Sequence, residues 1–538
     1  MRISCRRSLD WAIFVPDRLQ QHKENAESRQ SGGANAYAEF AECAGKTEGR
    51  NRSGGIPTIP TTQPGFRGSE YGDLSVANGR IGSSGGKKTA QAIQKEVAQE
   101  IDQLLQVIFA ALRKSGRLDL EAVEMATRSA MHQAGAAVLK ELLQKSRNEV
   151  AREVACPCGQ QARFHEMRPK QILTVLGRIY MQRAYYVCGH CHDGQSPLDC
   201  ELDIVGTECS PGVRRMMALV GSDGPFEHGR RQIEELAGLD VTNKTIERHS
   251  EGIGEDIIRR EEAEVQRAIQ LDLPEVHVAD IPMMYVEMDG TGVPVVASET
   301  EGRVGKIEGQ SARTREAKLG CVFTQTATDD QGRPIRDEDS TTYTGAIETA
   351  ELFGRRLYAE AHHRGWNRAK RKVVIGDGAI WIWNIADEHF PTAIQIVDLY
   401  HARQHLWELS GKLFSSDPQQ RLRWVKQVQK KLDAGKIESL VKTLHAFPPS
   451  TDELAKLLTT EAEYFARNAE RMRYPKFRAD HLFIGSGVIE AGCKTVIGSR
   501  LKQSGMFWTV RGANSILALR CNRLSHKFED YWESRRAA

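Results

Sequence analysis

An α/β fold is the class that the sequence predicts for the second half of the chain. Three apolar segments each run into an aspartate: Met283–Asp289, Lys372–Asp377 and Ala393–Asp398. Helix-forming stretches lie before the second segment, at Ala346–Ala361, and before the third, at Ala379–His389. Strands that alternate with helices are typical of layered α/β domains. A carboxylate at the end of a buried strand stands where sheet proteins place working groups, so these aspartates predict a site.

Composition limits the kinds of protein that this can be. The chain has 538 residues, 40% of them hydrophobic, which is enough for several domains, and a net charge of only +3. It has no apolar run of the ~20 residues that a membrane span needs, so we expect no membrane partner and a cytoplasmic, nucleoid-associated protein. Eleven cysteines fit a reducing compartment if some of them hold metal.

Basic residues gather in two stretches of the sequence. Arg467–Arg536 has 14 Lys/Arg against 6 Asp/Glu, and Arg364–Lys372 has five basic residues and no acid. Such stretches can neutralise phosphates, which predicts a nucleic-acid partner. A solvated helix face is the alternative interpretation of either stretch.

The N-terminal part of the chain divides into two regions. Residues 1–88 are polar, rich in Gly, Ser and Asn, and without sustained periodicity, so we expect disorder there. A start codon assigned too far upstream would give the same appearance. Residues 89–154 turn to good helix formers and predict a helical region.

Two close cysteine pairs predict a zinc ribbon over residues 155–210. Cys156 and Cys158 form the first pair, and Cys188 and Cys191 the second. The segment between them predicts a hairpin that turns at Gly177. Four thiolates suit a tetrahedral structural Zn²⁺. Because the first pair is C-x-C rather than C-x-x-C, other side chains could replace one thiolate, namely His190, His192 or Cys200.

Residues 211–272 predict a helix-turn-helix. One helix carries Ile233, Leu236 and Ala237, a turn spans Gly238–Val241, and Thr242 can cap the next helix. Asp240 occupies the turn position that usually holds glycine, which would require a left-handed conformation. The second helix would present four polar side chains to a major groove: Asn243, Lys244, Glu247 and Arg248. A plain helix pair is the alternative, and Glu255–Ala268 predicts a charged connecting helix.

The catalytic expectation rests on three acids. We predict a core in residues 280–404, an all-helical insertion in 405–480, and a last core segment in 481–538 that holds Glu490 and a basic C-terminal helix. Asp289, Asp377 and Glu490 are oxygen ligands of the kind that hard cations need. Two such cations can clamp an in-line phosphoryl displacement. Paired carboxylates could also cut glycosides, but a zinc ribbon and a helix-turn-helix would then have no role.

Several nearby residues admit a second interpretation. Glu287 shares a face with Asp289 and could bind metal, although a structural ion pair fits better. Glu461 and Glu463 also lie on late helices and compete with Glu490. Three tryptophans could stack on flipped bases, but a buried aromatic face is the better interpretation for Trp381, Trp383 and Trp407.

The order of these motifs resembles a bacterial insertion-sequence transposase of the ISKra group, akin to Mutator-type DDE transposases. The resemblance covers roughly Thr89 to the C-terminus and rests on the cysteine pairs, the helix-turn-helix and the segments Met-Asp289-Gly, Ile-Gly-Asp377-Gly-Ala, Val-Asp398-Leu-Tyr-His401 and Gly-Val-Ile-Glu490.

The resemblance implies an RNase H-like catalytic domain with a helical insertion before its glutamate. It implies that Asp289, Asp377 and Glu490 hold two Mg²⁺ (or Mn²⁺) per active site, cut double-stranded DNA at element ends and join them to target DNA. Asp398 and His401 match the (Cys/Asp)-x-x-His motif that supports the triad. We expect end binding by Asn243, Lys244, Arg248, Arg500 and Lys502, and a homo-oligomer when two ends are paired. The alternatives are a DNA-binding regulator with an inactive RNase H-like body, or a structure-specific nuclease without strand transfer.

Overall fold

The computed structural model describes residues 91–110 in part, and residues 119–145, 150–270, 272, 280–305 and 312–536 without interruption. All of them fall in the second of two structural units, Ile81–Ala538. The region 1–88, for which we predicted disorder, lies outside the described residues. No helix within the described ranges is both long enough and apolar enough to cross a membrane.

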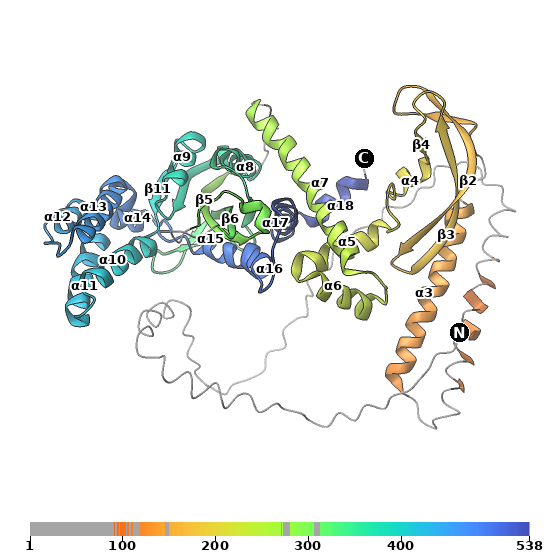
Figure 1. Ribbon diagram of the computed structural model, residues 1–538, viewed down its shortest axis with the longest axis horizontal. Helices are drawn as coiled ribbons and strands as arrows, with labels where there is room; N and C mark the ends of the chain where they lie inside the picture. The colour runs from red at the N-terminus through yellow and green to blue at the C-terminus, as the bar shows by residue number, and fades with distance from the viewer. Residues whose placement is uncertain are drawn as a thin grey trace. The chain divides into compact units, whose positions relative to one another are not determined.

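A long β-hairpin forms the first sheet (Figure 1). Strands β2 (Gln161–Thr174) and β3 (Gly177–Cys188) pair antiparallel along their whole length. They turn at Gly177, as predicted, and the φ of +111° there suits a residue without a Cβ. Two short outer strands complete the sheet and two helices accompany it: β1 (Glu153–Ala155), β4 (Gly194–Gln195), α3 (Leu120–Lys145) and α4 (Pro197–Glu201).

Three helices follow the hairpin: α5 (Pro211–Asp223), α6 (Phe226–Gln232) with its π-helical end η2 (Ile233–Ala237), and α7 (Asn243–Ile269). The α7 cap agrees with the prediction, because the Thr242 hydroxyl accepts a hydrogen bond from the Thr245 N–H at 3.1 Å. The prediction for Asp240 is wrong. Gly238 takes the left-handed conformation instead, with φ +66°, since glycine does so without a Cβ clash.

Helix α7 also corrects a predicted boundary. The connecting helix expected at Glu255–Ala268 is the continuation of α7, which runs unbroken for 27 residues. Gly254 does not interrupt it, because that glycine packs against α17. A Cβ at Gly254 would lie 2.0 Å from the Ser515 carbonyl oxygen.

The central sheet has five strands in the order β11-β10-β5-β6-β9. Strand β5 is parallel to β10, and β10 to β11, whereas β6 is antiparallel to both β5 and β9. The strands are β5 (Ile281–Pro294), β6 (Thr314–Gln325), β9 (Thr342–Ala346), β10 (Ala369–Gly376) and β11 (Ile394–Val397), with η3 (Ala297–Thr300) following β5 and a small hairpin of β7 (Ala327–Thr328) and β8 (Pro334–Ile335) following β6.

Two features of this sheet differ from the prediction. We expected β5 to end at Asp289 with a turn at Gly290, but it continues to Pro294 because its backbone stays paired with β6 as far as Thr314. Strand β9 was not predicted, since its sequence Thr-Tyr-Thr-Gly-Ala is short and largely polar.

Helices cover both faces of the central sheet. Gly320 on β6 faces α8 (Ala350–His363), where a Cβ would lie 2.6 Å from the Leu357 side chain. The preceding residue, Leu319, contacts Gly492 of α15 (Gly487–Gly492). Because neighbouring residues of a strand point to opposite faces, α8 and α15 lie on opposite sides. Helix α9 (Ile380–His389) packs against α8, and η4 (Trp366–Arg368) precedes β10.

The segment predicted as an all-helical insertion, 405–480, contains no strand (Figure 1). Its buried side chains, such as Trp424, Leu440 and Phe465, belong to the same hydrophobic core as the central sheet. Its helices are α10 (Leu399–Leu413), α11 (Pro418–Asp433), α12 (Ile437–His445), α13 (Asp452–Arg467), η5 (Ala469–Met472) and α14 (Tyr474–Ala479).

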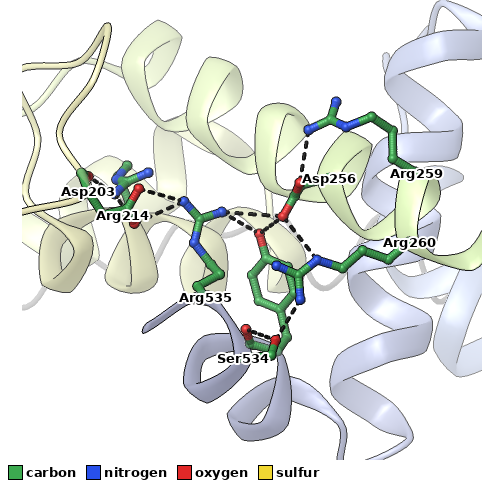
Figure 2. A network of polar contacts seen from close by, with 8 residues as sticks. Asp203, Arg214, Asp256, Arg259, Arg260, Ser534 and Arg535 are labelled. Carbon is green, nitrogen blue, oxygen red and sulfur yellow. Dashed lines mark hydrogen bonds and ion pairs between the residues drawn. The ribbon is translucent and has the colours of Figure 1, made fainter. Parts of the chain in front are cut away.

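The chain closes with helices that return to the N-terminal half of the described region. After α15 come η6 (Cys493–Gly498), α16 (Ser499–Leu501), α17 (Val510–Leu524) and α18 (Phe528–Arg536). Figure 2 shows how α18 is attached: the Arg535 guanidinium lies 2.9 Å from Asp203 Oδ2 and 3.4 Å from Asp256 Oδ2. Asp203 also pairs with Arg214 of α5 at 2.6 Å. The last helix is therefore fixed to both α5 and α7.

Candidate functional site

Parallel strands place Asp289 and Asp377 at the same edge of the central sheet. Glu287 of β5 stands opposite Ile375 of β10, and each aspartate lies two residues further along its strand. Asp377 opens the turn into α9, where its Oδ1 accepts a hydrogen bond from the Ala379 N–H at 2.9 Å. Adjacent parallel strands in register thus bring two carboxylates to one edge.

Helix α15 brings Glu490 to the same place. Asp289 pairs with Leu319 across the β5–β6 ladder, so its side chain is on the face that α15 covers. The Ile489 N–H donates to Glu287 Oε2 at 2.9 Å, and one turn later Cys493 Sγ lies 3.5 Å from Asp289 Oδ2. Glu490 is therefore held between two contacts to the strand that carries Asp289.

Electrostatics shows that these acids share one environment. Burial raises the pKa of Asp289, and the negative charge of Asp377 raises it further. Partial burial of its carboxyl raises the pKa of Glu490, as do the charges of Asp398 and Asp289. Negative groups that raise one another's pKa in this way would be relieved by a bound cation.

Glu287 is a fully buried carboxyl behind this cluster. Burial raises its pKa to about 8, with smaller contributions from the charges of Asp398 and Glu490, so it is largely protonated at pH 7. Its Oε1 is buried and has no hydrogen-bond partner among the described residues. The ion pair that we expected is wrong: no described cation pairs with Glu287, whose contact is to the backbone of α15.

Asp398 and His401 support the cluster in different ways. Asp398 is buried, its Oδ1 accepts from the backbone N–H groups of Tyr400 and His401, and its Oδ2 accepts from the Ser486 N–H at 2.7 Å and from the Ser486 hydroxyl. It therefore fixes both the start of α10 and the loop that leads to Glu490. Burial raises the pKa of both Asp289 and Glu490, and the nearby His401 partly offsets this by lowering both.

The helical insertion contributes contacts that the sequence analysis missed. The Tyr464 hydroxyl donates to the Asp377 carbonyl oxygen at 3.0 Å. His405 stacks on Tyr464 with ring centroids 4.1 Å apart, and its Nδ1 lies 2.9 Å from Glu461 Oε2. Because Glu461 contacts His405, it is a weaker candidate than Glu490 for the third carboxylate of the cluster. The i, i+4 spacing of His401 and His405 on α10 was the one sequence signal for this group.

The tryptophans agree with the aromatic-core interpretation. Trp383 is buried, and Trp381 and Trp407 pack against the same hydrophobic core while partly exposed. Arg421 lies over the Trp407 ring at 4.4 Å and Arg471 over Trp383 at 4.5 Å. Guanidinium groups thus occupy ring faces on which a base would have to stack.

Oxygen ligands of the kind at this edge fit hard divalent cations. Asp289 Oδ1 and Asp377 Oδ1 each accept a nearby backbone N–H, and Asp289 Oδ2 also lies 3.5 Å from Cys493 Sγ. A carboxylate oxygen with one such contact keeps a lone pair that could bind a ligand. Glu490 makes no side-chain hydrogen bond with any described residue. Within the described ranges, four cysteines are the one group of three or more metal-ligating side chains whose ligand atoms all lie within 4.8 Å of one another. Asp289, Asp377 and Glu490 do not form such a group.

The four predicted cysteines converge at the open end of the β2–β3 hairpin. Cys156 Sγ lies 3.5 Å from Cys191 Sγ, and Cys158 Sγ lies 3.6 Å from Cys188 Sγ. Four ligands at about 2.3 Å around a tetrahedral Zn²⁺ would be about 3.8 Å apart, so the cluster could hold a metal ion such as zinc. The alternative ligands His190, His192 and Cys200 are outside the cluster.

The start of α7 faces the hairpin across a cavity of about 780 Å³. Arg178 of β3 and Arg248 of α7 line it, and neither makes an ion pair with a described residue. By contrast, Lys170 and Arg183 in the same cavity both pair with Asp199. Two further predicted DNA contacts, Asn243 and Lys244, are exposed on the first turn of α7, where Lys244 pairs with Glu247 at 2.9 Å.

Two C-terminal predictions come out differently. Arg500 is fully buried: its Nε donates to the Gly221 carbonyl oxygen at 2.9 Å, and its guanidinium lies between Phe226 and Trp508. The prediction that Arg500 contacts DNA is therefore wrong, because no phosphate can reach it. Lys502 is exposed and donates to the Thr291 hydroxyl.

Comparisons with known proteins give two similarities. No family model matches the chain. It is 22% identical over 357 residues to a curated protein of Streptococcus gallolyticus, the UPF0236 protein in vanSb 3'region, an alignment that covers 63% of this chain and 69% of that protein. Among solved structures it is similar to the Drosophila P element transposase strand transfer complex at 8% sequence identity and a TM-score of 0.21, covering 59% of this chain and 79% of that chain.

Proposed function

We propose that this protein is a DDE-type DNA transposase of an insertion sequence, which cuts DNA at the element ends and transfers the freed strands to target DNA. The observation that carries the proposal is the meeting of Asp289, Asp377 and Glu490 at one edge of the central sheet. Three antiparallel strands continued by two parallel ones, with a helical insertion before the glutamate, support an RNase H-like assignment for this domain.

The three carboxylates would hold two Mg²⁺ or Mn²⁺ ions. Bound there, such ions stabilise the attacking and leaving oxygens of an in-line displacement at phosphorus. The chain's own residues position this site: Asp398 ties the start of α10 to the loop before Glu490, and Tyr464 holds the Asp377 backbone. Phosphodiester cleavage needs ligands in fixed positions, which these contacts supply.

Binding of the element ends would fall to the N-terminal half. The cysteine cluster would hold one structural Zn²⁺, and the start of α7 would enter the major groove of double-stranded DNA with Asn243, Lys244 and Arg248. Lys502 would contact the phosphate backbone. A homo-oligomer would pair the two ends.

The test uses purified full-length protein, labelled duplexes that carry the element ends, and Mg²⁺, with cleavage and joining scored separately. Asp289→Asn, Asp377→Asn and Glu490→Gln should each bind the ends almost normally and abolish both reactions, because the binding energy comes from distant basic contacts. Glu463→Gln is the matched control, since that glutamate is exposed and lies on the same insertion helix as Glu461. It should cut and join like the wild type.

Each alternative has its own outcome. Cleavage without joining would indicate a structure-specific nuclease. End binding without either reaction, in a wild type that matches all three triad variants, would indicate a DNA-binding regulator. Activity that survives Glu490→Gln but not Glu461→Gln or Glu463→Gln would show that the glutamate is assigned to the wrong position.

A further inference from the structure

Helix α11 presents a row of cations that no acid interrupts. From 418 to 432 the sequence has five Lys/Arg and no Asp or Glu. The helix buries Trp424, Val425, Val428 and Leu432 and exposes the opposite face. Arg423, Lys426 and Lys430 stand on that exposed face at i, i+3 and i+7, interleaved with the exposed amides of Gln419, Gln420 and Gln427.

These three cations have no partner within the part of the chain that the structure describes. None of them makes an ion pair, a side-chain hydrogen bond or a ring contact there, whereas Arg421 and Lys431 of the same helix do. A solvated helix normally intersperses acids among its cations at i, i+4, because such pairs stabilise it. The composition of α11 thus leaves uncompensated positive charge on one face.

The row of cations runs toward the candidate site. Arg403, in the second turn of α10, pairs with Asp433 at the end of α11 at a distance of 2.8 Å. Asp398, which lies beside the carboxylates, caps the start of α10, and Arg403 is close to that start. The end of α11 that carries Lys430 is therefore the end nearer the carboxylates. Arg423 lies seven residues back, about 10 Å along the helix at ~1.5 Å per residue.

We propose that this face of α11 (Arg423, Lys426 and Lys430) binds the phosphate backbone of duplex DNA next to the bond that is cut. The inference rests on the proposed function and assigns to the helical insertion a part in holding the substrate. The spacing of the charges suits a DNA strand. The three cations span about 10 Å, and successive phosphates of one strand are ~3.4 Å apart along the helix axis, so the row matches about three phosphates. The exposed amides of Gln419 and Gln420, before Arg423, and of Gln427, between Lys426 and Lys430, can donate to phosphate oxygens without adding charge.

The experiment compares two triple variants of the full-length protein. R423Q/K426Q/K430Q removes the row. K442Q/K456Q/K476Q removes the same charge from exposed cations of α12, α13 and α14, which likewise have no ion pair with a described residue. Binding to a duplex of the element end and to an unrelated duplex is measured by fluorescence anisotropy from 50 to 300 mM salt, with thermal melting of both variants as the check on folding.

The α11 triple should bind both duplexes roughly 10- to 100-fold more weakly at 100 mM salt. The slope of log K against log [salt] should fall by about 2–3, since each lost phosphate contact removes ~0.9 from it. The control triple should keep the wild-type slope, and both variants should melt like the wild type. A wild-type slope in the α11 triple, or equal losses in the two triples, would overturn the inference.

The design separates this inference from the function that it extends. If the wild type binds neither duplex in a salt-dependent way, the proposed transposase function fails. If the wild type binds and cuts but the α11 triple does both equally well, only the role of α11 fails.

Discussion

Two basic parts of the described chain use their charge in different ways. Many cations of the C-terminal segment 467–536 are engaged within the protein: Arg520 donates to the Val496 carbonyl oxygen at 2.6 Å, and Arg473 pairs with both Glu438 and Glu470. The cations on the exposed face of α11 have no described partner. Cationic side chains that are already paired within the protein help to hold the fold together. Only cations without such partners are available to bind the phosphates of a nucleic acid. Local composition does not distinguish the two uses.

Removal of the Zn²⁺ that we propose at the four cysteines is the largest perturbation that bears on this comparison. Cys188→Ser, or a strong chelator, should unfold the region around the β2–β3 hairpin, because a structural Zn²⁺ contributes its binding energy to folding. Metal analysis should find about one zinc per chain in the wild type and little in the variant. End-specific binding should drop at least 100-fold, while the salt-dependent binding that we attribute to α11 remains. Unchanged zinc content and fold in Cys188→Ser would contradict the cluster.

Substitution of Arg520, a buried cation of the C-terminal segment, tests how much such a residue contributes to stability. Arg520→Gln leaves the carbonyl oxygens of Val496 and Ser222 without their donor in a buried site. We expect a loss of about 3–5 kcal/mol in the free energy of unfolding, as when one member of a buried charged network is removed. Denaturant unfolding measures it, with R423Q, on the exposed face of α11, as the control that should change by less than ~0.5 kcal/mol. A destabilised R423Q beside an unaffected Arg520→Gln would reverse the comparison.

Glu287 extends the comparison to a buried acid. Its pKa, raised to about 8 by burial, lies above the unfolded value near 4.5, so the stability contributed by the neutral form is complete below pH ~4.5 and is lost as the pH rises toward 8. In EDTA, the wild type should therefore lose stability over this window, by an amount on the order of a few kcal/mol. Glu287→Gln, which imitates the protonated acid, should remove that part of the decline. Equal pH slopes in the two proteins would show that Glu287 is ionised in the folded state.

Arg535 should show the smallest effect. It is partly exposed and ties α18 to Asp203 and Asp256 (Figure 2), and such ion pairs contribute about 0.5–1.5 kcal/mol. Arg535→Gln should lower the melting temperature by a few degrees and leave DNA affinity within about twofold. A large loss of affinity without destabilisation would place Arg535 among the DNA contacts instead.

Sequence patterns predicted the parts of this fold that repeat over short distances. Strand periodicity correctly grouped Glu287 and Asp289 on one face, and the cysteine spacing correctly grouped the four thiols. Both signals depend on residues close in sequence, or on a hairpin that brings them together.

Partners from distant segments could not be predicted in the same way. The contacts of Tyr464 with Asp377 and of Arg500 with Gly221 join residues 87 and 279 positions apart. Charge counts for the C-terminal segment could not show which of its cations are paired for the same reason, since the acids and carbonyl groups that engage them lie in other elements. Strand β9 was missed because it is short and polar, so that its pairing with β6, rather than its own sequence, makes it a strand.

The distance in sequence between β5 and α15 has a consequence for biosynthesis. Cys493 contacts Asp289 across 204 residues, with the whole helical insertion between them. At roughly 5–20 residues per second, a ribosome that has finished β5 needs about 10–40 s more to deliver α15. During that interval the nascent chain carries first Asp289 and then both Asp289 and Asp377, without the glutamate. A product that ends within the insertion would keep the α7 surface but would lack Glu490, and so the complete carboxylate cluster. Such a product could compete with the full-length protein for DNA but could not cleave it.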